Sequence, residues 1–183
     1  MSNCITETEY RAACMANGDR YHELSDRWAY YLEVIRIIDN YGPFGNVLEI
    51  GPAWIPVVKG CDTMDNVVRA GQEEPVYRHN IKTRPWPIAD KEYDLVIALQ
   101  VWEHIYNNQI EAFGELKRIA RAAIMSFPLE WQCRRPFECT NCHCGITKQT
   151  ISAWTHHIEP VDYTIIYDSV GMKHKRRIYY LEF

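Results

Sequence analysis

The sequence predicts a three-layer α/β domain, in which helices cover both faces of a seven-stranded, mostly parallel sheet. In the middle of the chain, short apolar runs alternate with helical patterns, which is typical of parallel sheets. The final part reads as an antiparallel hairpin that closes the sheet. The segment at residues 7–40 is helical in character, and we predict an N-terminal helical cap at residues 1–45 ahead of an α/β core at residues 46–183.

The main helix of the cap is expected to begin after Ser25 or Asp26, either of which can cap it. Tyr41-Gly42-Pro43 should end it. Its apolar residues recur three and four positions apart and would form one buried stripe. The aromatic residues of the cap leave two interpretations open, a lid over a ligand or ordinary core packing. They are Tyr10, Tyr21, Trp28, Tyr30 and Tyr31.

The core should alternate strands with helices. Apolar, β-branched runs predict buried strands; these lie at residues 46–50, 60–65, 76–81, 93–98 and 122–128. Helical spacing predicts two helices; these lie at residues 109–121 and 148–154. The two arms of the terminal hairpin are expected at residues 159–168 and 176–183.

The composition is that of a soluble globular domain, with 47% apolar and 24% charged residues among 183. A formal net charge of −4 argues against a nucleic-acid partner. No apolar run approaches the ~18–20 residues of a membrane span, so we expect no membrane partner. The opening residues lack the pattern of a signal peptide, and we therefore expect a cytoplasmic protein.

The first informative block is NVLEIGPAWIPVVKGCDTMDN, residues 46–66. In it, a buried strand carries Glu49 two positions before Gly51, and Asp65 ends the next strand. Ligands of parallel sheets bind outside the carboxyl ends of the strands, and a carboxylate at the place of Asp65 can accept both hydroxyls of a ribose. Alternatively, the block is a strand and turn that merely contains Gly-Pro.

A second block, PWPIADKEYDLVIALQVWEHI at residues 85–105, combines a polar turn, a buried strand and a polar, aromatic exit. Together with VLEIGP and with ELKRIARAAIMSFP at residues 115–128, it resembles the class I S-adenosylmethionine-dependent methyltransferases. The resemblance spans about residues 46–128. It implies a three-layer α/β fold, S-adenosylmethionine as cofactor and methyl transfer as the activity.

The resemblance also implies roles for individual residues. Glu49 and Gly51 would shape the pocket for the methionine part of the cofactor, and Asp65 would bind the ribose hydroxyls. Asn80, where the family more often has Asp, would bond the adenine amino group, with Ile81 as its apolar neighbour. The two residues that follow the fourth strand would line the other side. The implied cofactor-binding residues are Glu49, Gly51, Pro52, Asp65, Asn80, Ile81, Leu99 and Gln100.

The segment after Gly51 departs from the family pattern, because Pro52 and two further non-glycine residues replace the usual glycines. Only eight residues separate Gly51 from Gly60, and Pro52 and Pro56 are among them, so the first crossover helix can have one turn at most. Such a helix normally presents its N–H groups to the cofactor. A non-catalytic binding module with a degenerate cofactor site is therefore the alternative. A nicotinamide-dependent enzyme is a weaker one, since no G-x-G-x-x-G follows the first strand.

The acceptor is expected to be a small molecule or a sugar methylated on oxygen. Only the cap and the loop at residues 129–147 lie outside the core elements, so little of the chain is available to form an acceptor site. A hydroxyl acceptor benefits from a general base. The candidates are His104, after the fourth strand, and His143, after the fifth. The alternative for His104 is a helix-start residue that bonds to the backbone, and for His143 an ordinary loop residue.

Four of the seven cysteines crowd into twelve positions; they are Cys133, Cys139, Cys142 and Cys144. Four thiolates can hold zinc, but structural sites usually separate their ligand pairs by a dozen or more residues. Reduced loop thiols are the preferred interpretation, a zinc site and a labile disulfide remain open, and we assign no metal ligand.

Overall fold

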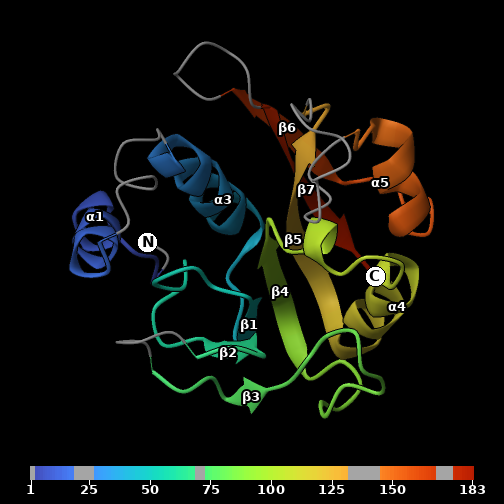
Figure 1. The fold of residues 1–183 in the computed structure, drawn as a ribbon, viewed down its shortest axis with the longest axis horizontal. Coiled ribbons are helices and arrows are strands. Elements are labelled where there is room, and N and C mark those ends of the chain that lie inside the picture. The colour runs from blue at the N-terminus through green and yellow to red at the C-terminus, as the bar shows by residue number, and fades with distance from the viewer. Residues whose placement is uncertain (1–2, 19–26, 69–72, 132–144, 168–174) are drawn as a thin grey trace.

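The computed structural model describes residues 3–18, 27–68, 73–131, 145–167 and 175–183. A seven-stranded sheet with the order β3-β2-β1-β4-β5-β7-β6 forms its centre (Figure 1). The strands β1 to β5 run parallel, and β7 runs antiparallel to both β5 and β6. The strand bounds are β1 Val47–Ile50, β2 Asp62–Asp65, β3 Tyr77–Arg78, β4 Tyr93–Leu99, β5 Ala120–Leu129, β6 Asp162–Tyr167 and β7 Lys175–Glu182.

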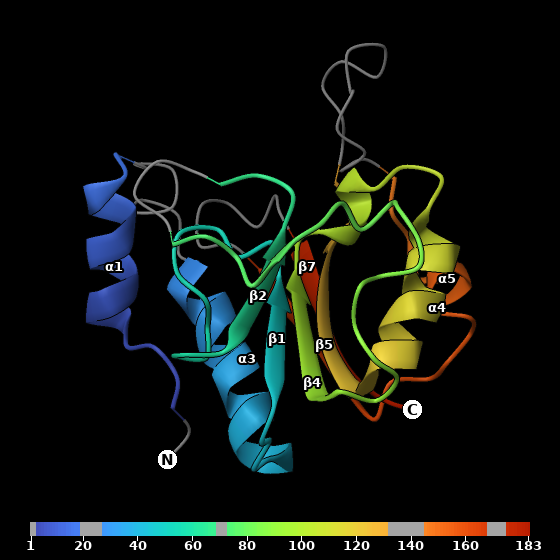
Figure 2. The ribbon, with the colours of Figure 1, turned by 90° about the horizontal axis from the view of Figure 1, so that it is seen from below.

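Helices cover both faces of the sheet, which confirms the predicted three-layer fold. Figure 2 shows α3 (Arg27–Tyr41) against one face with α1 (Glu7–Ala16) beyond it, whereas α4 (Gln109–Ile119) and α5 (Lys148–Trp154) lie on the other face. A single 3₁₀ turn, η1 (Trp102–His104), follows β4. Residues 51–61, all of which are described, contain no helix, in agreement with the prediction of a shortened first crossover.

The sheet separates two hydrophobic clusters. Leu95 and Ile97 of β4 face the α1–α3 side, while Val96 and Ala98 face the α4–α5 side. Successive side chains of a strand point to opposite faces, and both faces are covered here. This arrangement explains why β4 is a nearly continuous apolar run in the sequence.

The described aromatic residues of the cap belong to the core. The ring of Tyr10 on α1 packs at a tilt against that of Tyr31 on α3 with ring centroids 4.6 Å apart, and Trp28 contacts both rings. Tyr30 is buried, and its hydroxyl lies 2.8 Å from Oγ of Ser126 on β5. Tyr21 and the expected caps Ser25 and Asp26 lie outside the described residues. The division of the chain at residue 45 remains a prediction.

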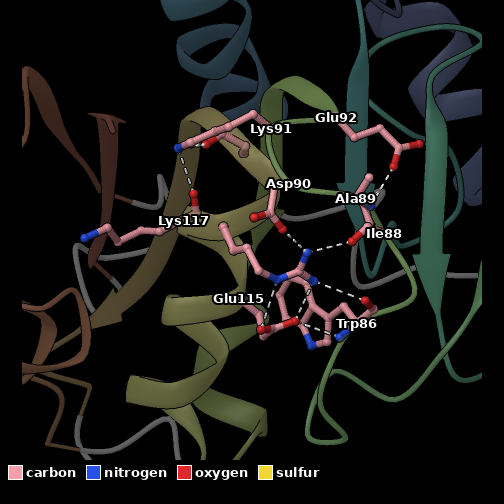
Figure 3. A network of polar contacts seen from close by, with 10 residues as sticks. Trp86, Ile88, Ala89, Asp90, Lys91, Glu92, Glu115 and Lys117 are labelled. Atoms are coloured by element: carbon pink, nitrogen blue, oxygen red, sulfur yellow. Dashed lines mark hydrogen bonds and ion pairs between the residues drawn. The ribbon is translucent and has the colours of Figure 1, made fainter.

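Helix α4 ends two residues earlier than expected, at Ile119, because β5 begins at once with Ala120. The Nζ atom of Lys91 donates hydrogen bonds to the carbonyls of Lys117 (2.8 Å) and Ala120 (2.7 Å), and so satisfies acceptors that a helix end leaves open (Figure 3). A cation at this end also suits the helix dipole. Arg121 therefore lies in a strand rather than in the helix.

The loop that precedes β4 is fixed to α4 by one guanidinium. Arg118 donates to the carbonyls of Ile88 (2.7 Å) and Trp86 (3.1 Å) and pairs with Asp90 and Glu115, both at 2.8 Å. Glu115 in turn accepts the backbone N–H of Trp86 at 2.7 Å, and Figure 3 shows these loop residues gathered around the helix. These contacts set the start of β4.

Candidate functional site

A cavity of about 660 Å³ lies at the carboxyl ends of β1, β2 and β4. Its volume falls within the ~300–1,000 Å³ of small-molecule sites, and its place is where open α/β sheets bind ligands. Several of the predicted site residues line it; they are Gly51, Asp65, Asn80, Ile81, Leu99, Gln100 and His104.

Gly51, the residue after β1, has no side chain and lines the cavity with its backbone. Gly51 has φ +63°, a conformation that residues with a side chain rarely adopt. Its N–H donates to the carbonyl of Met64 on β2 at 2.9 Å. A Cβ atom at this position would lie 3.1 Å from Cγ2 of Val101, which also lines the cavity. A glycine is therefore needed for both the turn and the space beside it.

The exits of β2 and β3 supply polar groups. Asp65 is the last residue of β2, and its Oδ1 accepts the N–H of Val67 at 3.0 Å, which holds the carboxylate at the rim of the strand. Asn80 follows β3, and its Oδ1 accepts the N–H of Lys82 at 3.0 Å. Its apolar neighbour Ile81 is buried. A carboxylate, an amide and an apolar side chain thus share one end of the cavity.

Gln100, the residue after β4, is linked by hydrogen bonds to β5 and, through β5, to α3. Gln100 has φ +56°, and its backbone N–H donates to Oγ of Ser126 at 3.0 Å. Its side-chain nitrogen reaches the same oxygen at 3.3 Å. Since Ser126 also bonds to Tyr30, a polar chain runs from the cavity wall through β5 to α3.

His104 lies in η1 and lines the cavity, although part of the residue is exposed to solvent. Partial burial of its ring and the positive charge of Lys82 lower the pKa of His104 below its usual 6.5. The ring is therefore neutral at pH 7 and able to accept a proton. His143, the other predicted base, lies outside the described residues.

Two predicted cofactor residues are placed elsewhere. Glu49 is 2% exposed, and its Oε2 accepts the N–H of Val57 at 2.6 Å, so this carboxyl group holds the crossover rather than facing the 660 Å³ cavity. Burial raises the pKa of Glu49 to about 8. Pro52 lines a neighbouring cavity of about 500 Å³ with Trp54 and Cys61. The proline follows Gly51 directly, and the tight turn carries it away from the first cavity.

Sequence reasoning did not find Arg27 and Trp131, which also line the cavity. Trp131 follows β5 closely, and its place after a strand of the sheet was a usable signal. Arg27 had no such signal, since only the packing of α3 against the sheet brings it there. The four clustered cysteines lie outside the described residues, and the described part of the chain holds no group of three potential metal ligands.

No family model and no curated protein matches the sequence. The fold does match solved structures. The N-methyltransferase NodS from Bradyrhizobium japonicum, in complex with S-adenosylhomocysteine, aligns with a TM-score of 0.61 at 15% identity, over 84% of this chain and 86% of that one. The chain has the fold of the class I S-adenosylmethionine-dependent methyltransferases.

Two further solved structures match the fold of this chain. A methyltransferase from Methanosarcina mazei aligns with a TM-score of 0.57 at 10% identity, over 80% of this chain and 96% of that one. The N-terminal domain of EvdMO1, crystallised with S-adenosylhomocysteine and D-fucose, aligns with a TM-score of 0.51 at 9% identity, over 83% and 82%. Among the described residues, no helix is long and apolar enough to span a membrane.

Proposed function

We propose that this protein transfers a methyl group from S-adenosylmethionine to oxygen on a small molecule or a sugar. One observation carries the proposal: in a methyltransferase fold, Gly51, Asp65 and Asn80 come from three different strand ends and line one cavity. Their side chains and backbone suit the three parts of the cofactor, and two of the similar structures were crystallised with its demethylated form.

The groups at the cavity fit the cofactor. Asp65 would accept the ribose hydroxyls, and the amide of Asn80 would bond the adenine amino group, because Oδ1 has a second lone pair besides the one used by Lys82. Ile81 and Leu99 would cover the faces of the adenine ring. At Gly51, the missing Cβ leaves the space that the methionine part would need.

When bound, S-adenosylmethionine supplies a methyl group on a sulfonium, which is already electrophilic. The chain therefore has to hold the acceptor in line and exclude water. His104 would accept the proton of the acceptor hydroxyl, since its lowered pKa keeps the ring neutral at pH 7. His143 stays a second candidate for this role.

The proposed acceptor is small because the cofactor itself would fill much of a 660 Å³ cavity. Trp131 adds an aromatic surface, which suits the apolar face of a sugar ring. The D-fucose present with the EvdMO1 domain is in keeping with a sugar, whereas NodS is an N-methyltransferase. We propose no nucleic-acid partner, given the net charge of −4.

Isothermal titration with S-adenosylhomocysteine tests the cofactor site. We expect one molecule to bind per chain and to raise the melting temperature. Transfer of a labelled methyl group to a panel of monosaccharides and small hydroxylated metabolites, with matched amines beside them, then tests the acceptor atom. Labelling of amines alone would reject the O-methylation proposal while leaving the methyltransferase intact.

A non-catalytic binding module is the second candidate, and the helix-free crossover at residues 51–61 favours it. Without that helix, the cofactor lacks the N–H groups that a helix start usually offers. On this alternative, S-adenosylhomocysteine gives neither heat of binding nor a thermal shift. The same titration therefore separates the two candidates.

A further inference from the structure

Ser126 is a polar residue inside the apolar run of β5, and it is 1% exposed. Its neighbours along the strand, Met125 and Phe127, are fully buried. A hydroxyl group without a hydrogen bond would cost free energy in such a place. The hydroxyl of Ser126 instead bonds to Gln100 and to Tyr30. Ser126 does not itself line the cavity of about 660 Å³, so it can act on the cavity only through Gln100, which does line it.

The direction of these hydrogen bonds follows from the atoms involved. A serine hydroxyl has one proton and two lone pairs. Both lone pairs of Ser126 accept from Gln100, one from the backbone N–H at 3.0 Å and one from Nε2 at 3.3 Å. The hydroxyl proton is left for Oη of Tyr30 at 2.8 Å, so Ser126 donates and Tyr30 accepts. In this way α3 fixes the rotation of the hydroxyl group that holds the residue after β4.

Gln100 has a backbone conformation that needs such support. Its φ of +56° lies in the left-handed region, which is unfavourable for any residue with a side chain. A residue keeps a strained conformation only where its surroundings over-determine it. The N–H of Gln100 also reaches the backbone carbonyl of Ser126 at 3.2 Å, a contact that any residue at position 126 would offer. The two bonds to Oγ are therefore the part of the support that depends on a serine.

The conformation of Gln100 sets the path of the chain along one wall of the cavity. Leu99 before it and Val101 after it line the same wall. Val101 lies next to Gly51, because its Cγ2 would be 3.1 Å from a Cβ atom built at position 51. A change of φ at Gln100 would redirect the chain at Val101. The space beside Gly51, which the methionine part of the cofactor would need, would change with it.

We propose that Ser126 is a positioning residue of the candidate site, because it holds Gln100 in the left-handed conformation. The space beside Gly51 then stays open for the ligand. The inference rests on the proposed function for the identity of that ligand, S-adenosylmethionine or its demethylated product. Tyr30 supports Ser126 by accepting its hydroxyl proton, so an aromatic residue of the cap contributes to the site without lining it.

Isothermal titration with S-adenosylhomocysteine tests this role by comparing Ser126→Ala in two backgrounds, the wild type and Gln100→Gly. Glycine adopts a positive φ readily, so a chain with Gly at position 100 should not need the hydroxyl. We expect Ser126→Ala to weaken binding about 10-fold in the wild-type background, as loss of hydrogen bonds can do, and less than about 3-fold in the Gln100→Gly background.

Thr155→Val is the matched control for the loss of a buried hydroxyl group. Thr155 is 1% exposed, and its hydroxyl donates to the carbonyl of Ile151 on α5 at 3.0 Å, away from the cavity. This variant should bind S-adenosylhomocysteine as the wild type does. Its melting temperature shows how much stability a buried hydroxyl group contributes when it has no part in the site.

Nuclear magnetic resonance gives a second readout, which needs no ligand. A 10-fold loss of affinity means that only about a tenth of the molecules keep the binding-competent conformation. The φ of Gln100, obtained from backbone chemical shifts, should therefore leave the left-handed region in Ser126→Ala and stay there in Thr155→Val. A hydroxyl group that only stabilises the core would lower the melting temperature and leave both φ and affinity unchanged.

The positioning role is supported when φ and affinity change together and the Gln100→Gly background removes the loss of affinity. Unchanged affinity, an equal loss in both backgrounds or an unchanged φ overturns it, while binding by the wild type leaves the proposed function intact. Should Ser126→Ala not fold, Ser126→Cys replaces it with the same expected pattern at smaller amplitude, because sulfur is a weak acceptor. Should the wild type not bind S-adenosylhomocysteine, the proposed function fails, and the chemical shifts alone decide whether Ser126 holds Gln100.

Discussion

The Oε2 atom of Glu49 lies 2.6 Å from the backbone nitrogen of Val57, eight residues further along the chain. The two residues belong to β1 and to the helix-free crossover, and both are buried. In a crossover without helical hydrogen bonds, this contact gives a buried N–H its acceptor. The acidic residue of VLEIGP therefore stabilises the connection between the strands.

Glu49→Gln should change how stability depends on pH. Burial raises the pKa of Glu49 from 4.5 to about 8, so between these values the unfolded chain loses a proton that the folded chain keeps. Each such group makes the free energy of unfolding fall by about 1.4 kcal/mol per pH unit as the pH rises through this window. Burial also raises the pKa of Glu103 to about 8, so both carboxyl groups make the free energy of unfolding depend on pH. Glu49→Gln should remove roughly half of this combined pH dependence.

Urea unfolding of the wild type and Glu49→Gln at pH 5, 6.5 and 8 measures this slope. Glutamine keeps an acceptor for the N–H of Val57 but does not titrate. Because only the wild type loses stability through this window, the variant should gain stability relative to the wild type as the pH rises. Two parallel stability curves would show that Glu49 does not titrate in this window.

Gly51→Ala should abolish or strongly weaken binding of S-adenosylhomocysteine, and Gly60→Ala is its matched control. Both glycines have positive φ, +63° and +69°, so alanine at either site costs about 1–2 kcal/mol of backbone strain. Only at Gly51 would the new Cβ meet a neighbour, Val101 at 3.1 Å. Thermal unfolding should show similar losses for both variants, and titration should separate them. Equal affinities would argue against a ligand beside Gly51.

Asp65→Asn should weaken S-adenosylhomocysteine by about 10- to 100-fold, since an amide replaces one of the two acceptor oxygens and removes the charge. Glu111→Gln, an exposed acidic residue at the start of α4, controls for the loss of one negative charge. Adenine alone lacks the ribose and should bind both variants as it binds the wild type. A uniform loss for adenine and S-adenosylhomocysteine would instead indicate a disturbed fold.

His104→Gln should lower kcat by roughly 10²- to 10⁴-fold with a hydroxyl acceptor, the usual contribution of a general base. Affinity for S-adenosylhomocysteine should stay the same. In the wild type, kcat should rise with pH and level off at a pKa below 6.5, because burial and Lys82 disfavour the imidazolium. Lys82→Met should move that midpoint upward. An unchanged pH profile in His104→Gln would exclude His104 as the base.

Arg118→Met should destabilise the protein by about 2–4 kcal/mol, because it leaves the carbonyls of Trp86 and Ile88 and the carboxylate of Glu115 without this donor. Arg121→Met is the control, since the Arg121 side chain is 63% exposed and its guanidinium pairs with Asp94 at 3.5 Å. That variant should lose less than about 1 kcal/mol. Urea unfolding compares them, and similar losses would mean that the loop does not depend on Arg118.

Strands and helices with a clear hydrophobic pattern could be predicted closely. The helix at Lys148–Trp154 has its predicted bounds, and β4 extends the predicted strand by one residue. The bounds were predicted less well where strand pairing sets them. The strand expected at residues 76–81 is only Tyr77–Arg78, and the one expected at residues 122–128 is Ala120–Leu129, because β4 and β7 pair with it on both sides.

For the candidate site, the apolar runs and turns of the sequence were enough to predict which residues stand at the ends of strands. Parallel strands of one sheet end at the same edge, so Gly51, Asp65, Asn80 and Gln100 had to come near one another. The directions of the individual side chains depend on packing between distant segments. This packing directs Glu49 toward Val57 and brings Arg27 to the cavity, because burial and packing between distant segments are set by the whole fold and leave no local pattern.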